Sequence, residues 1–253
     1  MKKIFIAVDN EVGNNVKKYI HKECLNLGLE ENRDYSFQEF SGKIFEADFL
    51  AEKSSKELNL FPSTHKSKDD KPNFTVHPTG VIGQKMFGGK DNTLNYSSGY
   101  FLRRAFEILE EENNTNIGTT LEATHHGPSD FHGPVLFVEI GATKKEWEDQ
   151  ENLKIIARTI SRLIGVKEEA HESALAFGGG HYCEKFLPLL KDKINFCHFI
   201  PGFKIKEALE ILPEIISKCT VKPTKAFIDW ENCSKKQELI EKLKNAGIES
   251  IRC

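Results

Sequence analysis

The chain has 253 residues, of which 39% are hydrophobic and 29% are charged, and its formal net charge is −3. This composition is typical of a globular protein, and no apolar run approaches the roughly 20 residues that span a bilayer, so we expect no membrane partner. The negative charge means that a nucleic-acid partner would need a local basic patch. The six cysteines lack CxxC spacing, which favours reduced thiols and a cytoplasmic location.

The N-terminal half begins with a predicted strand over residues 3–8 and a predicted helix over 12–27, which Gly28 ends. Short strand-like segments follow at 35–40, 43–45 and 57–60. From about residue 62 to 92 the apolar pattern gives way to Pro, Gly, Ser, Lys and Asp, which predicts a long functional loop. A helix is predicted over 96–112 and a strand over 117–121.

The C-terminal half alternates between apolar strand patterns and amphipathic helix patterns. Strands are predicted over 135–140, 173–177, 195–200, 225–229 and 248–251, with helices over 144–163, 205–219 and 234–246. This alternation predicts an α/β fold of three layers (α/β/α), built on one open, mostly parallel (mixed) sheet. Since no internal repeat interrupts the pattern, we predict a single domain over residues 1–253.

Three of the nine histidines, His125, His126 and His132, lie in the segment EATHHGPSDFHGP, residues 122–134. This Gly-Pro loop separates two predicted strands. Ligands of parallel sheets bind at the carboxyl ends of strands. Two other polar motifs also follow strands, Gly178–His181 and Asp229. We therefore expect all of them at one rim, with the long loop, which carries His65 and His77, folded over it.

Histidines and carboxylates at such a rim are suited to activating water, either by an imidazole base or through a bound metal ion. No GxSxG, HExxH or zinc-finger motif is present. Adjacent side chains on extended backbone diverge, so we expect only one of His125 and His126 to face the pocket. The other would anchor the loop against a carboxylate such as Glu139, which needs a partner inside its apolar strand. The glycines at 178–180 are either an anion cradle or a tight turn.

Several motifs in fixed order then resemble the D-aminoacyl-tRNA deacylases of the archaeal and plant type. The motifs that carry the resemblance are EATHHGP at 122–128, FVEIG at 137–141 with Glu146-Trp147, GGGHY at 178–182, TVHPTG at 75–80, GGKD at 88–91, HFIP at 198–201 and Asp229-Trp230. They cover about residues 58–230. The chain departs from the family pattern at Thr64, where arginine is usual, at His132, where no histidine is expected, and at Cys183-Glu184.

The resemblance implies a phosphorylase/hydrolase-like fold and a monomeric, zinc-dependent esterase. Such an enzyme releases the D-amino acid from the terminal adenosine of D-aminoacyl-tRNA, which is proofreading of chirality. On this basis water activation is assigned to His125, His126 and His181, and substrate binding to Thr79, Lys90, Gly178, Gly179 and Gly180. The candidate ligands for Zn²⁺ are His65, His77, Glu139 and Asp229. Which of these residues bind metal is left open.

Two other functions remain compatible with the residues. One is a tRNA- or nucleotide-binding module without catalysis, in which the histidines are structural. The other is a metallohydrolase similar to peptidyl-tRNA hydrolases or aminopeptidases. For any tRNA ligand, the densest basic region is the predicted contact, and it consists of Lys66, Lys68, Lys71, Lys85, Lys90, Arg103 and Arg104.

Overall fold

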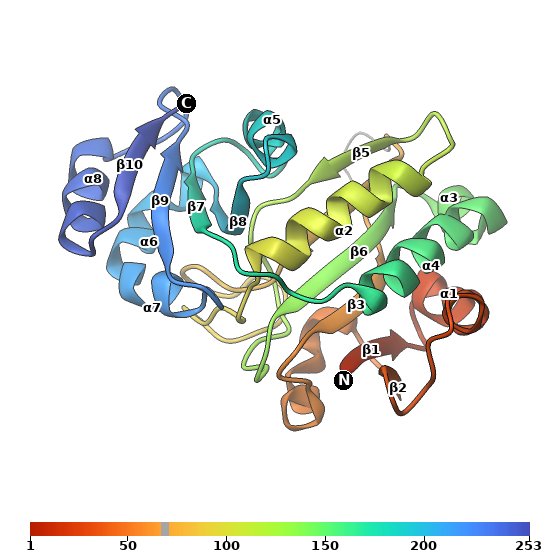
Figure 1. The fold of residues 1–253 in the computed structure, drawn as a ribbon. Coiled ribbons are helices and arrows are strands. Elements are labelled where there is room, and N and C mark those ends of the chain that lie inside the picture. The colour runs from red at the N-terminus through yellow and green to blue at the C-terminus, as the bar shows by residue number, and fades with distance from the viewer. Residues whose placement is uncertain (67–70) are drawn as a thin grey trace.

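The computed structural model describes residues 1–66 and 71–253, and its larger sheet has six strands in the order β2-β1-β3-β6-β4-β5 (Figure 1). The strands are β1 (Lys2–Ala7), β2 (Tyr35–Phe40), β3 (Asn59–Thr64), β4 (Asn73–Pro78), β5 (Gly118–Leu121) and β6 (Val135–Gly141). β1, β2, β3 and β6 run parallel, whereas β4 is antiparallel to β6 and parallel to β5. The mixed, mostly parallel sheet is therefore confirmed.

The remaining strands form a second sheet rather than an extension of the first. β7 (Ser173–Phe177), β8 (Asn195–Ile200), β9 (Pro223–Ile228) and β10 (Glu249–Arg252) are all parallel, in the order β10-β9-β7-β8. The prediction of one sheet was wrong in this respect. Strand-helix alternation is the same within each sheet, so the pattern does not show where one sheet ends.

Helices cover both sheets, and α2 lies between them (Figure 1), where it contacts β4 of the larger sheet and β8 of the smaller one. The α-helices are α1 (Glu11–Asn26), α2 (Gly99–Glu112), α3 (Lys144–Glu148), α4 (Gln150–Gly165), α5 (Leu187–Lys191), α6 (Ile205–Glu210), α7 (Leu212–Ser217) and α8 (Lys236–Asn245). Three 3₁₀ helices are η1 (Ile44–Lys53), η2 (Glu184–Phe186) and η3 (Gly202–Lys204). α1, α2 and α4 cover one face of the larger sheet, and η1 packs on its other face.

Two predicted helices are each divided in the structure. The helix predicted over 144–163 breaks at Asp149, whose carboxylate caps α4 by accepting hydrogen bonds from the amides of Glu151 and Asn152. The helix predicted over 205–219 breaks before α7, which has Pro213 in its first turn. Proline has no N–H to donate to the preceding turn, so it begins a new helix there.

The predicted long loop contains regular structure that its composition concealed. β3 continues to Thr64 and β4 occupies 73–78, so much of the region pairs with β6. Pro62 lies inside β3, opposite Val138, although proline is rare in central strands. The strand predicted at 43–45 was also wrong, because Ile44 begins η1. Residues 80–92 remain a loop, as predicted.

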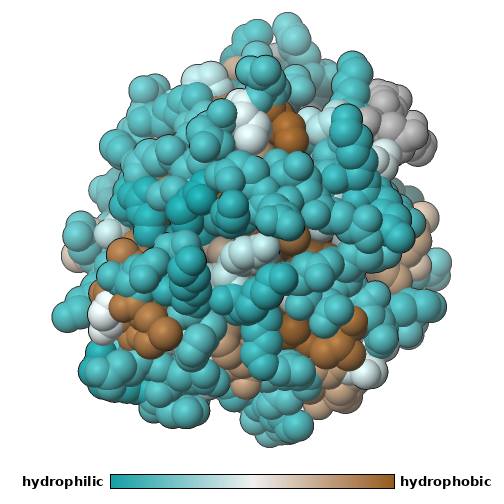
Figure 2. Space-filling view, turned by 90° about the vertical axis from the view of Figure 1, so that its right-hand side faces the viewer, coloured by the Kyte–Doolittle hydropathy of each residue, from teal (hydrophilic) through white to brown (hydrophobic). Residues whose placement is uncertain are grey.

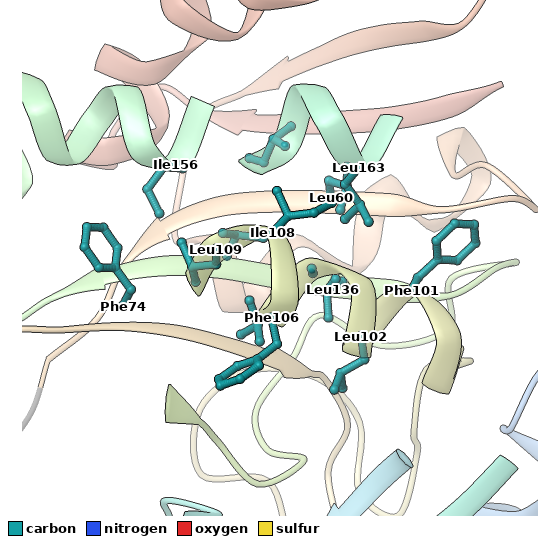
Figure 3. Close-up of a cluster of buried hydrophobic side chains, with 14 of the residues drawn as sticks. Leu60, Phe74, Phe101, Leu102, Phe106, Ile108, Leu109, Leu136, Ile156 and Leu163 are labelled. Carbon is teal, nitrogen blue, oxygen red and sulfur yellow. The ribbon is translucent and has the colours of Figure 1, made fainter. Parts of the chain in front are cut away.

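The main core fills the space between the larger sheet and its helices. Figure 3 shows Leu60, Phe74 and Leu136 from the strands facing side chains of α2 and α4, such as Leu109 and Ile156. These side chains are at most 3% exposed. Residues of β7, β8 and β9 belong to the same cluster, so the core continues from the larger sheet to the smaller one across α2.

Aromatic rings stack across four neighbouring strands on the opposite face of the larger sheet. Phe61 of β3 lies between Phe5 of β1 and Phe137 of β6, with ring centroids 4.8 Å away on each side. His77 of β4 continues the row at 5.2 Å from Phe137. We call these four residues the aromatic row. Strand side chains alternate between faces, which is why this row is separate from the main core.

The surface around α1, α3 and α4 is mostly hydrophilic, with small separate hydrophobic patches (Figure 2). Among the described residues, no helix is both long enough and apolar enough to cross a membrane.

Replacing Phe61 with alanine is expected to lower the free energy of unfolding by about 3–5 kcal/mol, because it leaves a cavity inside the aromatic row. The matched control is Phe49→Ala, whose ring is 65% exposed and whose loss should change stability by no more than about 0.5 kcal/mol. Urea unfolding of the wild type and both variants measures the difference. Equal losses for the two variants would contradict a structural role for the row.

Candidate active site

The polar residues converge on the face of the larger sheet that carries the aromatic row. Glu139 lies two residues beyond Phe137 in β6, and His65 directly follows β3. The amide of His65 donates to the carbonyl of Ile140 at 2.9 Å, which extends the β3–β6 pairing by one residue. Residues two apart in a strand share a face, so both side chains reach the same region as His77.

Two buried carboxylates, Glu122 and Glu139, form the centre of the site. Glu122 is fully buried and Glu139 is 4% exposed. Nδ1 of His65 lies 3.0 Å from Oε1 of Glu122 and 3.5 Å from Oε2 of Glu139. Burial opposes the charge of each group, but their mutual contacts outweigh it. They raise the pKa of His65 to about 10 and, with His77, lower the pKa of Glu139 to about 2.

Three imidazole rings pack together beside these carboxylates. The ring of His77 lies 4.4 Å from that of His125 and 5.0 Å from that of His126. The Nδ1–H groups all donate to backbone carbonyls, at 3.1 Å from His77 to Pro78 and 2.7 Å from His125 to Ala123. His126 donates in the same way to the carbonyl of Gly127. Nε2 of His125 and His126 is therefore left with a lone pair, whereas Nε2 of His77 lies 3.7 Å from Oε2 of Glu139, a contact that outweighs burial and raises the pKa of His77.

The prediction that His125 and His126 diverge was wrong. His126 has a φ of 43°, in the left-handed region, so the backbone is not extended and both rings turn toward His77. Neither anchors Glu139, which pairs with His65 and His77 instead. Burial lowers the pKa of His125 well below its usual value and that of His126 to about 4, with neighbouring imidazoles adding to the effect.

His181 enters the site from the loop after β7 of the smaller sheet. Its Nε2 lies 2.9 Å from Oε2 of Glu122, while 41% of its side chain is exposed. The next residue, Tyr182, has its hydroxyl 2.8 Å from Nε2 of His65. This loop therefore contacts Glu122 through His181 and His65 through Tyr182.

Backbone hydrogen bonds join this loop to the histidine segment. The amide of Ala123 donates to the carbonyl of His181 at 2.8 Å, and that of Cys183 donates to Leu121 at 3.0 Å. The amide of Thr124 donates to Phe199 of β8 at 2.9 Å. The site is thus assembled from both sheets.

The donor atoms suit a metal ion. Three groups have all their ligand atoms within 4.8 Å of one another, namely His77-His125-His126, Glu122-His125-His181 and His65-Glu122-Glu139. Among the described residues, Nε2 of His77 and both oxygens of Glu122 have no aligned hydrogen-bond partner although they are buried. Imidazole nitrogen and carboxylate oxygen are ligands that zinc takes. The residues present therefore fit the metal that the resemblance implies.

The other predicted site residues lie outside this cluster. The carboxylate of Asp229 accepts hydrogen bonds from the side chain of Asn232 at 2.8 Å and the amide of Glu231 at 3.2 Å. Among the described residues, Asp229 is in none of the groups that could hold a metal. The hydroxyl of Thr79 accepts from the Asn95 side chain at 2.6 Å, and the backbone of Thr79 forms a bridge with that of His125.

The glycine segment and the predicted basic face are also partly occupied by contacts within the protein. The amide of Gly178 donates to the carbonyl of Ile200 at 2.8 Å, so it is not free for an anion, whereas Gly180 has open space around it. Lys90 pairs with Asp130. Arg103 and Arg104 pair with Glu107 on α2, and Lys68 lies outside the described residues.

Sequence reasoning missed Glu122 and Tyr182 as site residues. Both lie inside recognised motifs, but the catalytic roles were assigned to the neighbouring histidines. The available signal was the position of Glu122, a carboxylate directly after the apolar end of a strand. A carboxylate that follows a buried strand usually needs a partner.

Two cavities meet at the histidines. The larger, of about 740 Å³, has polar residues such as Asn10, Thr64 and Glu139 among its lining residues. The smaller, of about 230 Å³, is mostly apolar. His125, His126, His181 and Phe87 line both cavities. A substrate could therefore extend to either side of the histidines.

The sequence of this chain is similar to those of known proteins of one family. The family model described as D-aminoacyl-tRNA deacylase matches residues 52–251. A D-aminoacyl-tRNA deacylase of Pyrococcus furiosus is 31% identical over 241 residues, covering 90% of this chain and 89% of the relative. One of Methanocaldococcus jannaschii is 34% identical over 207 residues, covering 75% and 80% respectively.

A solved structure, the crystal structure of a conserved protein of unknown function named AF0625, superposes with a TM-score of 0.85. It is 25% identical in sequence, and the match covers 100% of this chain and 95% of that one. The family model spans most of the chain, the relatives align over most of their length, and the recognised motifs line one site. This chain belongs to the D-aminoacyl-tRNA deacylase family.

Proposed function

We propose that this protein hydrolyses the ester that joins a D-amino acid to the terminal ribose of tRNA, releasing the D-amino acid and free tRNA. Family membership supports the reaction, since the curated relatives are D-aminoacyl-tRNA deacylases. The single structural observation that carries it is the histidine–carboxylate cluster at the junction of two cavities. One cavity can take the aminoacyl group while the other takes the nucleotide, with the ester between them.

His181 and Glu122 are the pair that fits proton transfer. Glu122 is buried and contacts Nε2 of His181, so it orients the ring and leaves Nδ1 available as a base. Nδ1 takes a proton from water as its oxygen attacks the ester carbonyl carbon. The proton then passes to the ribose oxygen as its bond to that carbon breaks. His181 is the more exposed member of the pair, which suits a group that meets substrate.

His77, His125 and His126 are the residues that fit zinc best. Each has its Nδ1–H held by a backbone carbonyl, and such outer hydrogen bonds orient histidine ligands. The low pKa of His125 and His126 keeps these rings neutral, as metal ligands must be, whereas zinc would displace the proton that Glu139 favours on His77. When bound there, zinc would supply Lewis acidity and lower the pKa of a water molecule.

The remaining features fit the same proposal. His65, held between Glu122 and Glu139, is a charged structural residue rather than a ligand. Lys43 and Lys66 line the larger cavity and Lys204 lines the smaller one. Lys43 pairs with Glu46 and Lys204 with Glu207, so a tRNA phosphate would compete with these carboxylates for the two lysines. We propose a monomeric, cytoplasmic enzyme, and a tRNA substrate fits that location.

The first test is chirality. With tRNA charged with either enantiomer of the same amino acid, the D-aminoacyl ester is expected to be hydrolysed much faster, because the relatives are named for D-aminoacyl-tRNA. Release of labelled amino acid gives both rates. Equal rates would contradict the proposal. Binding without release would favour a non-catalytic tRNA-binding module, and cleavage of peptidyl-tRNA instead would favour the other metallohydrolase class.

The second test separates the base from the metal ligands. His181→Gln is expected to lower kcat by about 10²–10⁴ while zinc content stays unchanged, because a general base typically contributes that factor. His126→Asn is expected to lower both activity and zinc content, and asparagine tolerates the left-handed backbone there. The control is His132→Gln, whose ring is 47% exposed beside Glu52 and which should be silent. Zinc loss in the His181 variant alone would reverse the two assignments.

A further inference from the structure

The smaller cavity beside the histidines has a lining that is mostly apolar, and more so than that of the larger one. Its walls include Val81, Ile82 and Met86 from the loop at 80–92 and Phe203 from η3. The histidines that line it are His125, His126 and His181. The catalytic groups of the proposed function are polar, so they do not account for this apolar surface.

Aromatic and sulfur-containing side chains at this cavity are unusually exposed. Met86 is 79% exposed, Phe203 67% and Phe87 59%. Side chains this exposed add little to the stability of the fold, and exposed aromatic rings beside a site are the usual platforms on which single-stranded bases stack. Met86 and Phe87 come from the loop at 80–92, after β4 of the larger sheet, and Phe203 comes from η3, after β8 of the smaller sheet.

The loop at 80–92 is held in place by close glycine contacts. Gly88 has a φ of 60°, and a Cβ there would lie 1.7 Å from the carbonyl oxygen of Phe45. The amide of Gly127, directly after His126, donates to the carbonyl of Phe87 at 3.0 Å. Phe87 is therefore positioned by the histidine segment itself, so the stacking surface and the cluster keep a fixed spacing.

Polar groups at the cavity suit a nucleotide. Gln84 and Lys204 line it beside the aromatic rings. A glutamine amide matches the donor and acceptor pair on the edge of adenine, and lysine matches phosphate. A nucleotide bound in this cavity must also place its ester at the histidines. In aminoacyl-tRNA, a single ribose joins the terminal adenine to that ester.

We infer that the cavity lined by Phe87, Phe203 and Gln84 binds the terminal adenine of the single-stranded acceptor end, while the larger cavity takes the aminoacyl group. The inference rests on the proposed function, because it places the adenosine of that substrate. Phe203 is a positioning residue in this assignment, and it acts on affinity for every aminoacyl-tRNA regardless of the amino acid.

The kinetic test compares Phe203→Ala, Phe203→Tyr and the control Phe49→Ala, whose ring is similarly exposed at 65% but does not line the cavity. Removing one stacking ring should raise KM by about 5- to 100-fold with kcat nearly unchanged, while tyrosine restores the wild-type value. The rise should be the same for D-tyrosyl-tRNA and D-aspartyl-tRNA. A rise for the aromatic substrate alone would assign the cavity to the amino-acid side chain. No rise for either substrate would also overturn the inference.

A binding test needs no catalysis. The fluorescence of 2-aminopurine riboside 5′-monophosphate should be quenched by the wild type and by Phe49→Ala, but much less by Phe203→Ala, and AMP should compete better than CMP. If the wild type quenches but hydrolyses no D-aminoacyl-tRNA, the proposed function fails and the nucleotide site stands. If the wild type hydrolyses D-aminoacyl-tRNA but does not quench the fluorescence of the nucleotide, the inferred nucleotide site is wrong and the proposed function is supported.

Discussion

The burial of two carboxylates, Glu122 and Glu139, is the constraint on which the site depends. A buried carboxylate without partners costs several kcal/mol, so the surrounding chain must supply positive or hydrogen-bonding groups. His65 meets both carboxylates, His77 approaches Glu139, and His181 approaches Glu122. The carboxylates outweigh burial and raise the pKa of His65 to about 10, whereas burial, with the neighbouring His77, lowers the pKa of His126 to about 4, so a charged and a neutral histidine lie in the same cluster.

The antiparallel strand β4 makes this arrangement possible. A sheet built only from the parallel strands β1, β3 and β6 would end beside Glu139. β4 adds His77 directly opposite Phe137, so the histidine completes the aromatic row and reaches the carboxylate at the same time. The packing of the sheet and the chemistry of the site therefore share one residue. A substitution in the aromatic row should therefore change the position of His77 as well as the stability of the fold.

Most strands and helices were predictable because their apolar periodicity is strong, and the ordered motifs identified the family. The pairing of carboxylates with histidines was not predictable, because it depends on contacts between strands far apart in the chain. The direction of His126 was missed because one backbone angle decides it, and composition carries no sign of that angle. The second half of β3 and the whole of β4 were hidden by Pro62 and Pro78, whose presence usually argues against a strand. The division into two sheets had no local signal at all.

The backbone bonds between the histidine segment and the smaller sheet have a consequence for local dynamics. The amides of Ala123, Thr124 and Cys183 each donate across the junction of the two sheets. Their protons can exchange with solvent only when that junction opens, whereas amides inside either sheet exchange when the sheet itself unfolds. Hydrogen–deuterium exchange at these three positions would therefore measure how often the two halves of the site separate while each sheet stays folded.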